Sequence, residues 1–333
     1  MNICICGGGS LGLVCAGVLT SHRDVKLFLL TKHPQSWSHS ISVLDCNNKI
    51  YQGYIDKISS NAADVIPNAD IILLCQPGFL IEQTLKEIKP YVNEQSIIGS
   101  IVSSTGFFFF AHDILGDKAK LFGFQRTPFI ARVAEYGHKG NLLGYKKKLY
   151  IAIENIFDRE RFRQNIERLF LTPTMLLKSF YEAALTNSNP ILHTGRLYAM
   201  WKDWNGEIYP RCSFFYKEWD IESAQTIICM DKEFMTLLDI LHVRKGAIPP
   251  LLDYYESTDA ESLCQKLQSI PAFQNISSPM IKIDGGWIPD INSRYFTEDF
   301  PYGLYFIKKL AEKSNLQIPI INKIYNWGIK WQI

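Results

Sequence analysis

Apolar residues in the first half of the chain fall into short continuous runs separated by helix-like stretches. Continuous apolar runs of this length are typical of strands buried on both faces. The stretches "LVCAGVLTSH" and "FLIEQTLKEIKPYV" between them favour helices. Strands that alternate with helices predict a parallel sheet covered on both faces. The predicted strands lie at residues 2–6, 25–31, 69–77 and 95–102.

Two further stretches, "KLFGFQRTPFIARVAEYG" and "NLLGYKKKLYIAIE", are also strand-like and are expected to complete this sheet before about residue 154. The pattern then changes. "DRERFRQNIERLFL" has a helical period, and Asp158 is placed to cap its start. We therefore expect two domains, a sheet-containing domain over residues 1–150 and a mainly α-helical domain over residues 151–333. Further helical patterns cover residues 179–201, 221–243, 259–269 and 301–331.

A glycine-rich loop, "GGGSLG", lies between the first predicted strand and the first predicted helix. It matches G-x-G-x-x-G, in which the first glycine permits a tight turn, the second lets a pyrophosphate approach, and the third lets the helix pack on the strand. The phosphates would face free N–H groups at the helix N-terminus. In this context the loop predicts an α/β Rossmann dinucleotide-binding domain, although a purely structural turn is the alternative. The predicted cofactor-binding residues are Gly7, Gly9, Ser10, Leu11 and Gly12.

The end of the second predicted strand bears on which dinucleotide binds. An acidic residue there would bind the ribose 2′-OH of NAD, but this strand ends in Thr31 and Lys32. A lysine and a hydroxyl suit a 2′-phosphate, so the pattern favours NADP(H) over NAD(H). The alternative for Lys32 is a solvated loop residue. Pro77, just past the carboxyl end of another predicted strand, is expected to lie under the cofactor.

Charge and cysteine usage exclude several classes of partner. The 35 basic and 33 acidic side chains give a net charge of +2, which offers no electrostatic case for nucleic acid or an anionic membrane. No stretch is a clean membrane span, and no signal peptide is evident. The eight cysteines form no C-x-x-C pair, so neither a metal site nor a disulfide framework is predicted. We expect a reduced, cytoplasmic protein with small-molecule partners.

Two polar clusters interrupt the apolar helical pattern of the second domain. In "SNPILHTGRLY", His193 lies four residues after Asn189, so a helix would place both on one face. In "NSRYFTEDFPYG", Thr297 is a good N-cap and Pro301 suits a first helical turn. Asp299 would then lie in that first turn, where the helix dipole favours its ionised form. Taken singly, His193 is more simply a packed core histidine.

The motifs N-P-I-L-H at 189–193 and S-R-Y-x-T-E-D at 293–299, together with the glycine loop, resemble the octopine/nopaline (opine) dehydrogenase family. The resemblance spans both domains and implies a second domain like the C-terminal domain of 6-phosphogluconate dehydrogenase. It also implies an NAD(P)H-dependent condensation of a 2-oxo acid with the amino group of an amino acid or related amine. Carried over by motif, it implies that His193 is the acid/base, that Asp299 pairs with it, and that Arg294 contacts substrate.

Physical chemistry is consistent with these roles. An ionised Asp299 beside an imidazole fixes its tautomer and stabilises the protonated ring, which can protonate an imine or carbonyl that receives hydride. The planar fork of Arg294 suits a substrate carboxylate, and Asn189 could hold the substrate or the nicotinamide carboxamide. Each residue also has a plain alternative. Asp299 could simply lie at a helix start, Arg294 could form a surface ion pair, and Asn189 could cap or turn the chain. The aromatic-rich segment 198–219 is either a pocket wall or core and receives no role.

Two other functions remain open. A simple 2-oxo acid reductase of the ketopantoate reductase type has a similar two-domain plan, but it would be expected to carry a lysine where this chain has His193. A non-catalytic NADP(H)-binding sensor would bind the cofactor without turnover. A homodimer is expected only by analogy with other two-domain dehydrogenases.

Overall fold

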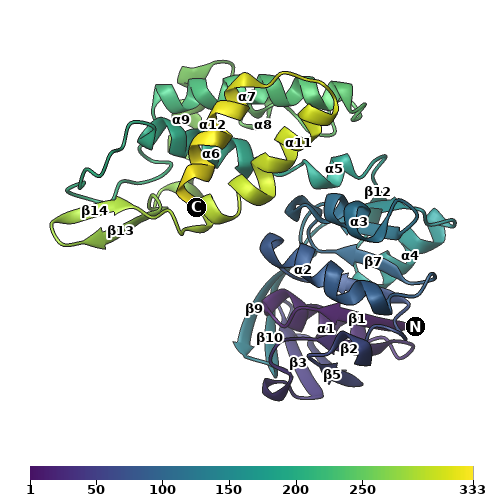
Figure 1. Cartoon of the computed structure of the whole chain (residues 1–333). Helices are drawn as coiled ribbons and strands as arrows, with labels where there is room; N and C mark the ends of the chain where they lie inside the picture. The colour runs from purple at the N-terminus through teal and green to yellow at the C-terminus, as the bar shows by residue number, and fades with distance from the viewer. Residues whose placement is uncertain (333) are drawn as a thin grey trace. The chain divides into compact units, whose positions relative to one another are not determined.

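The computed structural model describes residues 1–332. By their internal contacts they form two compact units, Met1–Thr186 and Asn187–Ile333, and each unit is described by itself (Figure 1).

The main sheet of the first unit runs in the order β12-β11-β8-β7-β6-β1-β2-β5. Its neighbours are parallel except for β11 and β8, which are antiparallel. The central strands coincide with the apolar runs of the sequence, so the predicted parallel sheet is confirmed. The strands are β1 (Asn2–Cys6), β2 (Lys26–Leu30), β5 (Lys57–Ser59), β6 (Ile71–Leu74), β7 (Ile97–Ser100), β8 (Lys120–Phe124), β11 (Leu149–Glu154) and β12 (Thr174–Leu176).

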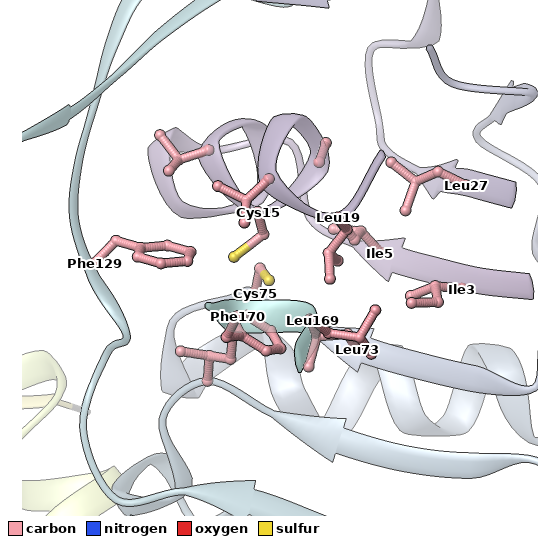
Figure 2. Close-up of a cluster of buried hydrophobic side chains, with 14 of the residues drawn as sticks. Ile3, Ile5, Cys15, Leu19, Leu27, Leu73, Cys75, Phe129, Leu169 and Phe170 are labelled. Carbon is pink, nitrogen blue, oxygen red and sulfur yellow. The ribbon is translucent and has the colours of Figure 1, made fainter. Parts of the chain in front are cut away.

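Helices cover both faces of this sheet because successive strand side chains point to opposite sides. Ile3 and Ile5 of β1 join the core under α1 (Ser10–Thr20) and α4 (Arg159–Phe170), part of which is shown in Figure 2. Cys4 and Cys6 face the core under α2 (Gly78–Ile88) and α3 (Phe107–Leu115), where they are fully buried. A short helix, α5 (Tyr181–Ala184), follows β12.

A second sheet packs on the far side of α1, in the order β4-β3-β10-β9. Helix α1 is therefore buried on all sides from Gly12 to Leu19, which explains why its sequence is apolar all round. A Cβ atom at Gly17 would lie 2.4 Å from Cγ2 of Val43, so only glycine permits this close approach. The strands of this sheet are β3 (Ser40–Asp45), β4 (Ile50–Tyr54), β9 (Phe129–Glu135) and β10 (Lys139–Tyr145).

The prediction that residues up to about 154 complete one sheet is therefore wrong in part. Strands β8 and β11 do join the main sheet, but β9 and β10 belong to the second sheet. The physical difference is visible in their burial. β9 alternates between buried and exposed side chains, whereas β8 is buried along most of its length, as a strand covered on both faces must be.

The division between the units lies later in the chain than the sequence predicts. Residues were expected to separate into 1–150 and 151–333, but contacts divide them after Thr186. β12 pairs with β11, and α4 contributes Phe162 and Ile166 to the core of the first unit. The predicted cap of α4 is confirmed, since Asp158 accepts a hydrogen bond from Arg161 N. The first helix after residue 150, α4, therefore packs on the sheet of the first unit, and the second unit begins only after Thr186.

The second unit is mainly helical, as predicted. Helices α6 and α7 pack so closely at Gly195 that a Cβ atom there would lie 2.6 Å from Cγ2 of Ile227. An unpredicted hairpin, β13 (Met280–Ile283) and β14 (Gly286–Pro289), turns at Gly285. No helix within residues 1–332 combines the length and apolar character needed to cross a membrane. The helices are α6 (Asn189–Trp201), α7 (Ile221–Ile240), α8 (Leu251–Tyr254), α9 (Ala260–Ser269), α10 (Arg294–Thr297), the π-helical η6 (Phe300–Leu304), α11 (Tyr305–Lys313) and α12 (Pro319–Ile329).

Candidate active site

The glycine loop forms a tight connection between β1 and α1 in the first unit. Gly7 has a φ of +118°, and its N–H donates to the carbonyl of Leu30 at 3.0 Å. A Cβ atom on Gly7 would lie 2.7 Å from the Cys75 carbonyl oxygen, and one on Gly12 would lie 2.0 Å from the Gly7 carbonyl oxygen. Both glycines are therefore required by backbone packing. Gly9 differs, because no atom lies within 4 Å of the Cβ it would carry.

The open space over Gly9 faces the start of a helix. α1 begins at Ser10, and Gly9 in the N-cap position has no side chain with which to cap it. The first N–H groups of a helix have no partner within the helix, so those of Ser10, Leu11 and Gly12 are available to an anion.

A cavity of about 340 Å³ opens beside this loop within the first unit. It is lined by five of the residues predicted to bind the cofactor, namely Gly7, Gly9, Thr31, Lys32 and Pro77. Pro77 lies directly before α2. Several other residues that line the cavity were not predicted. Gly8 is a variable position within the glycine motif, and Glu87 lies within α2. The others follow strands without any recognisable motif, and they are His33, Ser60, Gln76 and Tyr136.

The lining of this cavity fits a dinucleotide. The side-chain oxygen of Gln76 is buried and has no hydrogen-bond partner within residues 1–332, as expected of a group that awaits a ligand donor. The end of β2 presents Thr31 and Lys32 to the cavity, whereas the carboxylate of Glu87 comes from α2. Space over Gly9, free helix N–H groups and an unpartnered amide oxygen therefore occur together.

In the second unit, His193 makes a hydrogen bond through each ring nitrogen. Nδ1 lies 2.8 Å from Oδ2 of Asp299, and Nε2 lies 2.9 Å from the hydroxyl oxygen of Tyr216. The His193 and Asp299 side chains are only 11% and 15% exposed. Asn189 is the first residue of α6, one turn before His193, so the expected helical spacing is present. The structure thus brings together two polar groups that lie 106 residues apart.

The local start of the helix at Asp299 differs from the prediction. Thr297 is not an N-cap, since it ends α10 and its hydroxyl donates to the Ser293 carbonyl at 3.2 Å. Asp299 instead directly precedes η6, with Pro301 in the first turn as expected. A Cβ atom on Gly303 would lie 2.5 Å from Cγ of Pro190. This close packing of η6 on the start of α6 holds Asp299 against His193.

Tyr216 was not predicted as a site residue. Its ring stacks on Phe273 at 4.2 Å and on Trp219 at 5.7 Å between ring centres, and only 4% of the residue is exposed. Burial raises the pKa of the Tyr216 phenol, and Tyr295, Tyr255 and Asp299 add to the rise, so the hydroxyl stays neutral. Nothing in the run "SFFYKEW" distinguishes Tyr216 from its aromatic neighbours, because its contact with His193 is tertiary.

Other aromatic rings surround the imidazole. Tyr295 lies 4.6 Å from His193 between ring centres, and Phe215 lies 5.6 Å away. Burial also raises the pKa of the Tyr295 phenol. The aromatic-rich segment that received no role therefore supplies part of the wall around His193.

Arg294 forms an ion pair with Glu298. Its Nε and Nη2 donate to the two carboxylate oxygens of Glu298 at 2.8 and 2.6 Å, and 79% of its side chain is exposed. The hydrogen bond with Glu298 raises the pKa of Arg294. An exposed ion pair of this kind contributes little to stability, so Arg294 is not needed to hold the fold. Throughout residues 1–332, no three His, Cys, Asp or Glu side chains gather in positions that could hold a metal ion.

Two models of known protein families match different parts of the chain. The family model described as the alpha-helical domain of NAD/NADP octopine/nopaline dehydrogenase matches residues 176–330, and the ketopantoate reductase PanE/ApbA model matches residues 3–105. An opine dehydrogenase of Haliotis discus hannai and an octopine dehydrogenase of Pecten maximus are each 25% identical to the chain, over 98% of the chain and 89% of their own length.

Solved structures show the same fold. An octopine dehydrogenase with NADH and pyruvate matches with a TM-score of 0.85 and 24% identity, over 99% of this chain and 89% of that one. A yersinopine dehydrogenase with bound NADP+ matches with a TM-score of 0.72 and 10% identity, over 99% and 90%. The predicted fold, a Rossmann domain followed by a mainly helical domain, is confirmed.

Proposed function

The chain belongs to the octopine/nopaline (opine) dehydrogenase family, and on that premise we propose that it joins a 2-oxo acid to the amino group of an amino acid or related amine. It is an oxidoreductase of the opine dehydrogenase type. The reaction forms an imine with loss of water, and reduction of the imine gives a secondary amine. The observation that carries the proposal is the partly buried hydrogen bond between His193 and Asp299.

His193 acts as the general acid/base. The ionised carboxylate of Asp299 can only accept, so it holds the hydrogen on Nδ1 and leaves Nε2 as the nitrogen that gains and loses a proton. Condensation needs such a group, because a hydroxyl must be protonated to leave as water and an imine must be protonated as it accepts hydride. Arg294 and Asn189 bind the substrate in this proposal, with the Arg294 fork transferring from Glu298 to a substrate carboxylate.

The first unit holds the dinucleotide. NAD(P)H supplies the hydride when bound; Gly9 leaves room for its pyrophosphate, the N–H groups of Ser10, Leu11 and Gly12 bind the phosphates, and Pro77 lies beneath it. We propose that the cofactor is NADP(H) rather than NAD(H), since Lys32 and Thr31 line the cavity at the end of β2 where a carboxylate would bind the ribose of NAD.

Substitution of Lys32 tests the choice of cofactor. Lys32→Ala removes a charge that would face a 2′-phosphate, and loss of one such contact is expected to raise the Kd for NADPH about tenfold while the Kd for NADH stays unchanged. Titration calorimetry with both cofactors measures this. Lys26→Ala, at the opposite end of the same strand, is the control. Equal weakening of both cofactors, or of neither, would remove Lys32 from the 2′-phosphate site.

The activity itself is tested by following NADPH and NADH absorbance with 2-oxo acids, each with and without a panel of amines. We expect oxidation that requires both substrates and is lost in His193→Ala. Oxidation with the 2-oxo acid alone would instead indicate a reductase of the ketopantoate type, the family whose model matches residues 3–105. Cofactor binding without any turnover would indicate a sensor.

A further inference from the structure

The nitrogen of His193 that exchanges protons faces a tyrosine. Asp299 occupies Nδ1, and the Tyr216 hydroxyl lies 2.9 Å from Nε2. In the neutral ring Nε2 accepts a hydrogen bond from that hydroxyl, and in the protonated ring the Nε2–H donates to the hydroxyl oxygen. A proton that leaves Nε2 along this hydrogen bond therefore meets the oxygen of Tyr216 first.

Tyr216 is held in this position by its surroundings. Its ring stacks on Phe273 and Trp219, and the N–H of the preceding Phe215 donates to the Ile276 carbonyl at 2.8 Å. The carboxylate of Glu218 accepts from Phe214 N at 2.9 Å and closes the turn that carries Tyr216. The ring is thus fixed, whereas the hydroxyl hydrogen can still rotate about its C–O bond.

We propose that Tyr216 is a catalytic residue, whose hydroxyl passes the proton between His193 and the substrate. The proposal rests on the proposed function. As the imidazolium Nε2–H bond breaks, its proton goes to the Tyr216 oxygen, and the hydrogen already on that oxygen goes to the leaving hydroxyl of the carbinolamine. The C–O bond breaks, water departs and the C=N bond forms. His193 ends neutral, Tyr216 is unchanged, and one proton has been transferred.

The environment of Tyr216 suits a relay better than an independent base. Because the buried phenol resists ionisation, it does not hold a charge of its own between turnovers. A neutral hydroxyl can accept and donate in one step, which keeps a phenolate from forming in an apolar wall. Sequence reasoning placed His193 as the acid/base but offered no group between it and the substrate.

Tyr216→Phe tests the relay, because it keeps the stacked ring and removes only the hydroxyl. We expect kcat for amine-dependent NAD(P)H oxidation to fall by about 100-fold, within the usual range for acid–base catalysis, with KM little changed. The dependence of kcat on the fraction of D2O is expected to be curved in the wild type, because two protons move together, and linear in the variant. Tyr198→Phe, which loses a hydroxyl from the same helix as His193, is the matched control and should keep wild-type kcat.

The outcomes of these measurements distinguish failure of the Tyr216 relay from failure of the proposed function. Wild-type turnover together with unchanged or increased kcat in Tyr216→Phe overturns the relay and leaves the proposed function standing, since the substrate would then displace the hydroxyl. A reduced kcat with a D2O dependence that stays curved also overturns the relay, because Tyr216 would be structural. Absence of amine-dependent turnover in the wild type overturns the proposed function, and the relay with it.

Discussion

The acid/base chemistry of His193 depends on a single carboxylate oxygen of Asp299, 2.8 Å away. Asp299→Asn keeps the size of the side chain, but its amide can donate to Nδ1 and so favours the tautomer with hydrogen on Nε2. We expect kcat to fall by about 1,000-fold, within the range known for acid–base groups, with the NADPH Kd unchanged because the nucleotide cavity lies wholly in the first unit. Steady-state kinetics and cofactor titration measure the two effects.

The control for this substitution is Asp290→Asn, which alters a carboxylate that accepts only from the nearby Asn292 N–H in the described structure. It should leave kcat near the wild-type value. If Asp299→Asn retains kcat within about threefold of wild type, Asp299 has no part in positioning the imidazole.

At the residue scale, the sequence predicted that His193 pairs with Asp299, but it did not predict the residues that surround this pair. The motifs at 189–193 and 293–299 point to His193 and Asp299, and the structure brings them into contact. Tyr216 lies in neither motif and reaches His193 only through the fold of the second unit. The role of Arg294 could not be decided from the sequence, because the same arginine can either form a surface ion pair, as it does with Glu298, or contact a substrate.

At the scale of elements, the two later glycines of the loop serve different purposes, and this difference is measurable. Gly12→Ala would place its Cβ against the Gly7 carbonyl, so it is expected to destabilise the protein by about 3 kcal/mol through overpacking. Gly9→Ala meets no protein atom and has an ordinary φ of −84°, so its Tm should stay near the wild-type value. Its methyl group would instead fill the space proposed for the pyrophosphate.

Thermal melts and NADPH titrations of the two variants check this contrast. Gly9→Ala should lose at least about tenfold in NADPH affinity without loss of stability, since even a partial loss of phosphate contacts exceeds 1.4 kcal/mol. Unchanged NADPH affinity in Gly9→Ala would show that the dinucleotide does not cross the loop at this glycine.

Asp231 links two helices of the second unit and makes its stability depend on pH. The Asp231 carboxylate of α7 accepts from Leu251 N at the start of α8 at 2.9 Å. Burial raises the pKa of Asp231 to about 6, and the nearby Asp253 charge adds to the rise. The folded state therefore holds this proton more tightly than the unfolded state. The resulting stability is complete below pH 4 and is lost as the pH rises through 6.

Asp231→Asn removes this dependence. The free energy of unfolding of the variant relative to wild type should rise by about 2–3 kcal/mol between pH 4 and pH 7.5. Urea unfolding followed by tryptophan fluorescence reports on the second unit, which holds six of the seven tryptophans, all but Trp37. Asp239→Asn, an exposed carboxylate on the same helix, is the control. A parallel pH profile for wild type and Asp231→Asn would contradict the raised pKa.

Element types were largely predictable, but their partners were not. The apolar run at 2–6 and the glycine loop predicted β1 and α1, because local pattern and backbone conformation decide them. Whether β9 joins the main sheet or a second one depends on which surface its alternating face covers. The apolar sequence of α1 indicates that the helix is covered on every side, but it does not indicate which strands cover it. Thr297 has the chemistry of an N-cap, but the packing of η6 on Pro190 moved the helix start beyond it.

At the scale of the whole molecule, the position of the boundary between the two units decides which residues the first unit needs for its stability. α4 buries Phe162, Ile166, Leu169 and Phe170 in the core of the first unit. Burying four such side chains contributes roughly 6–12 kcal/mol, which is comparable with the net stability of a whole domain. A first unit that ends near residue 150 also cuts through β11 and lacks β12, its edge neighbour.

Two fragments distinguish the boundaries. Residues 1–186 should unfold cooperatively and bind NADPH with nearly the affinity of the full chain, because every residue that lines the cavity lies between Gly7 and Tyr136. Residues 1–150 contain the same lining, yet they lack the α4 side chains that cover one face of the sheet, so they should not fold. Circular dichroism in urea and NADPH titration compare the two. Cooperative unfolding and NADPH binding by residues 1–150 would show that the nucleotide-binding domain ends where the sequence predicts, and that α4 stabilises a fold already complete without it.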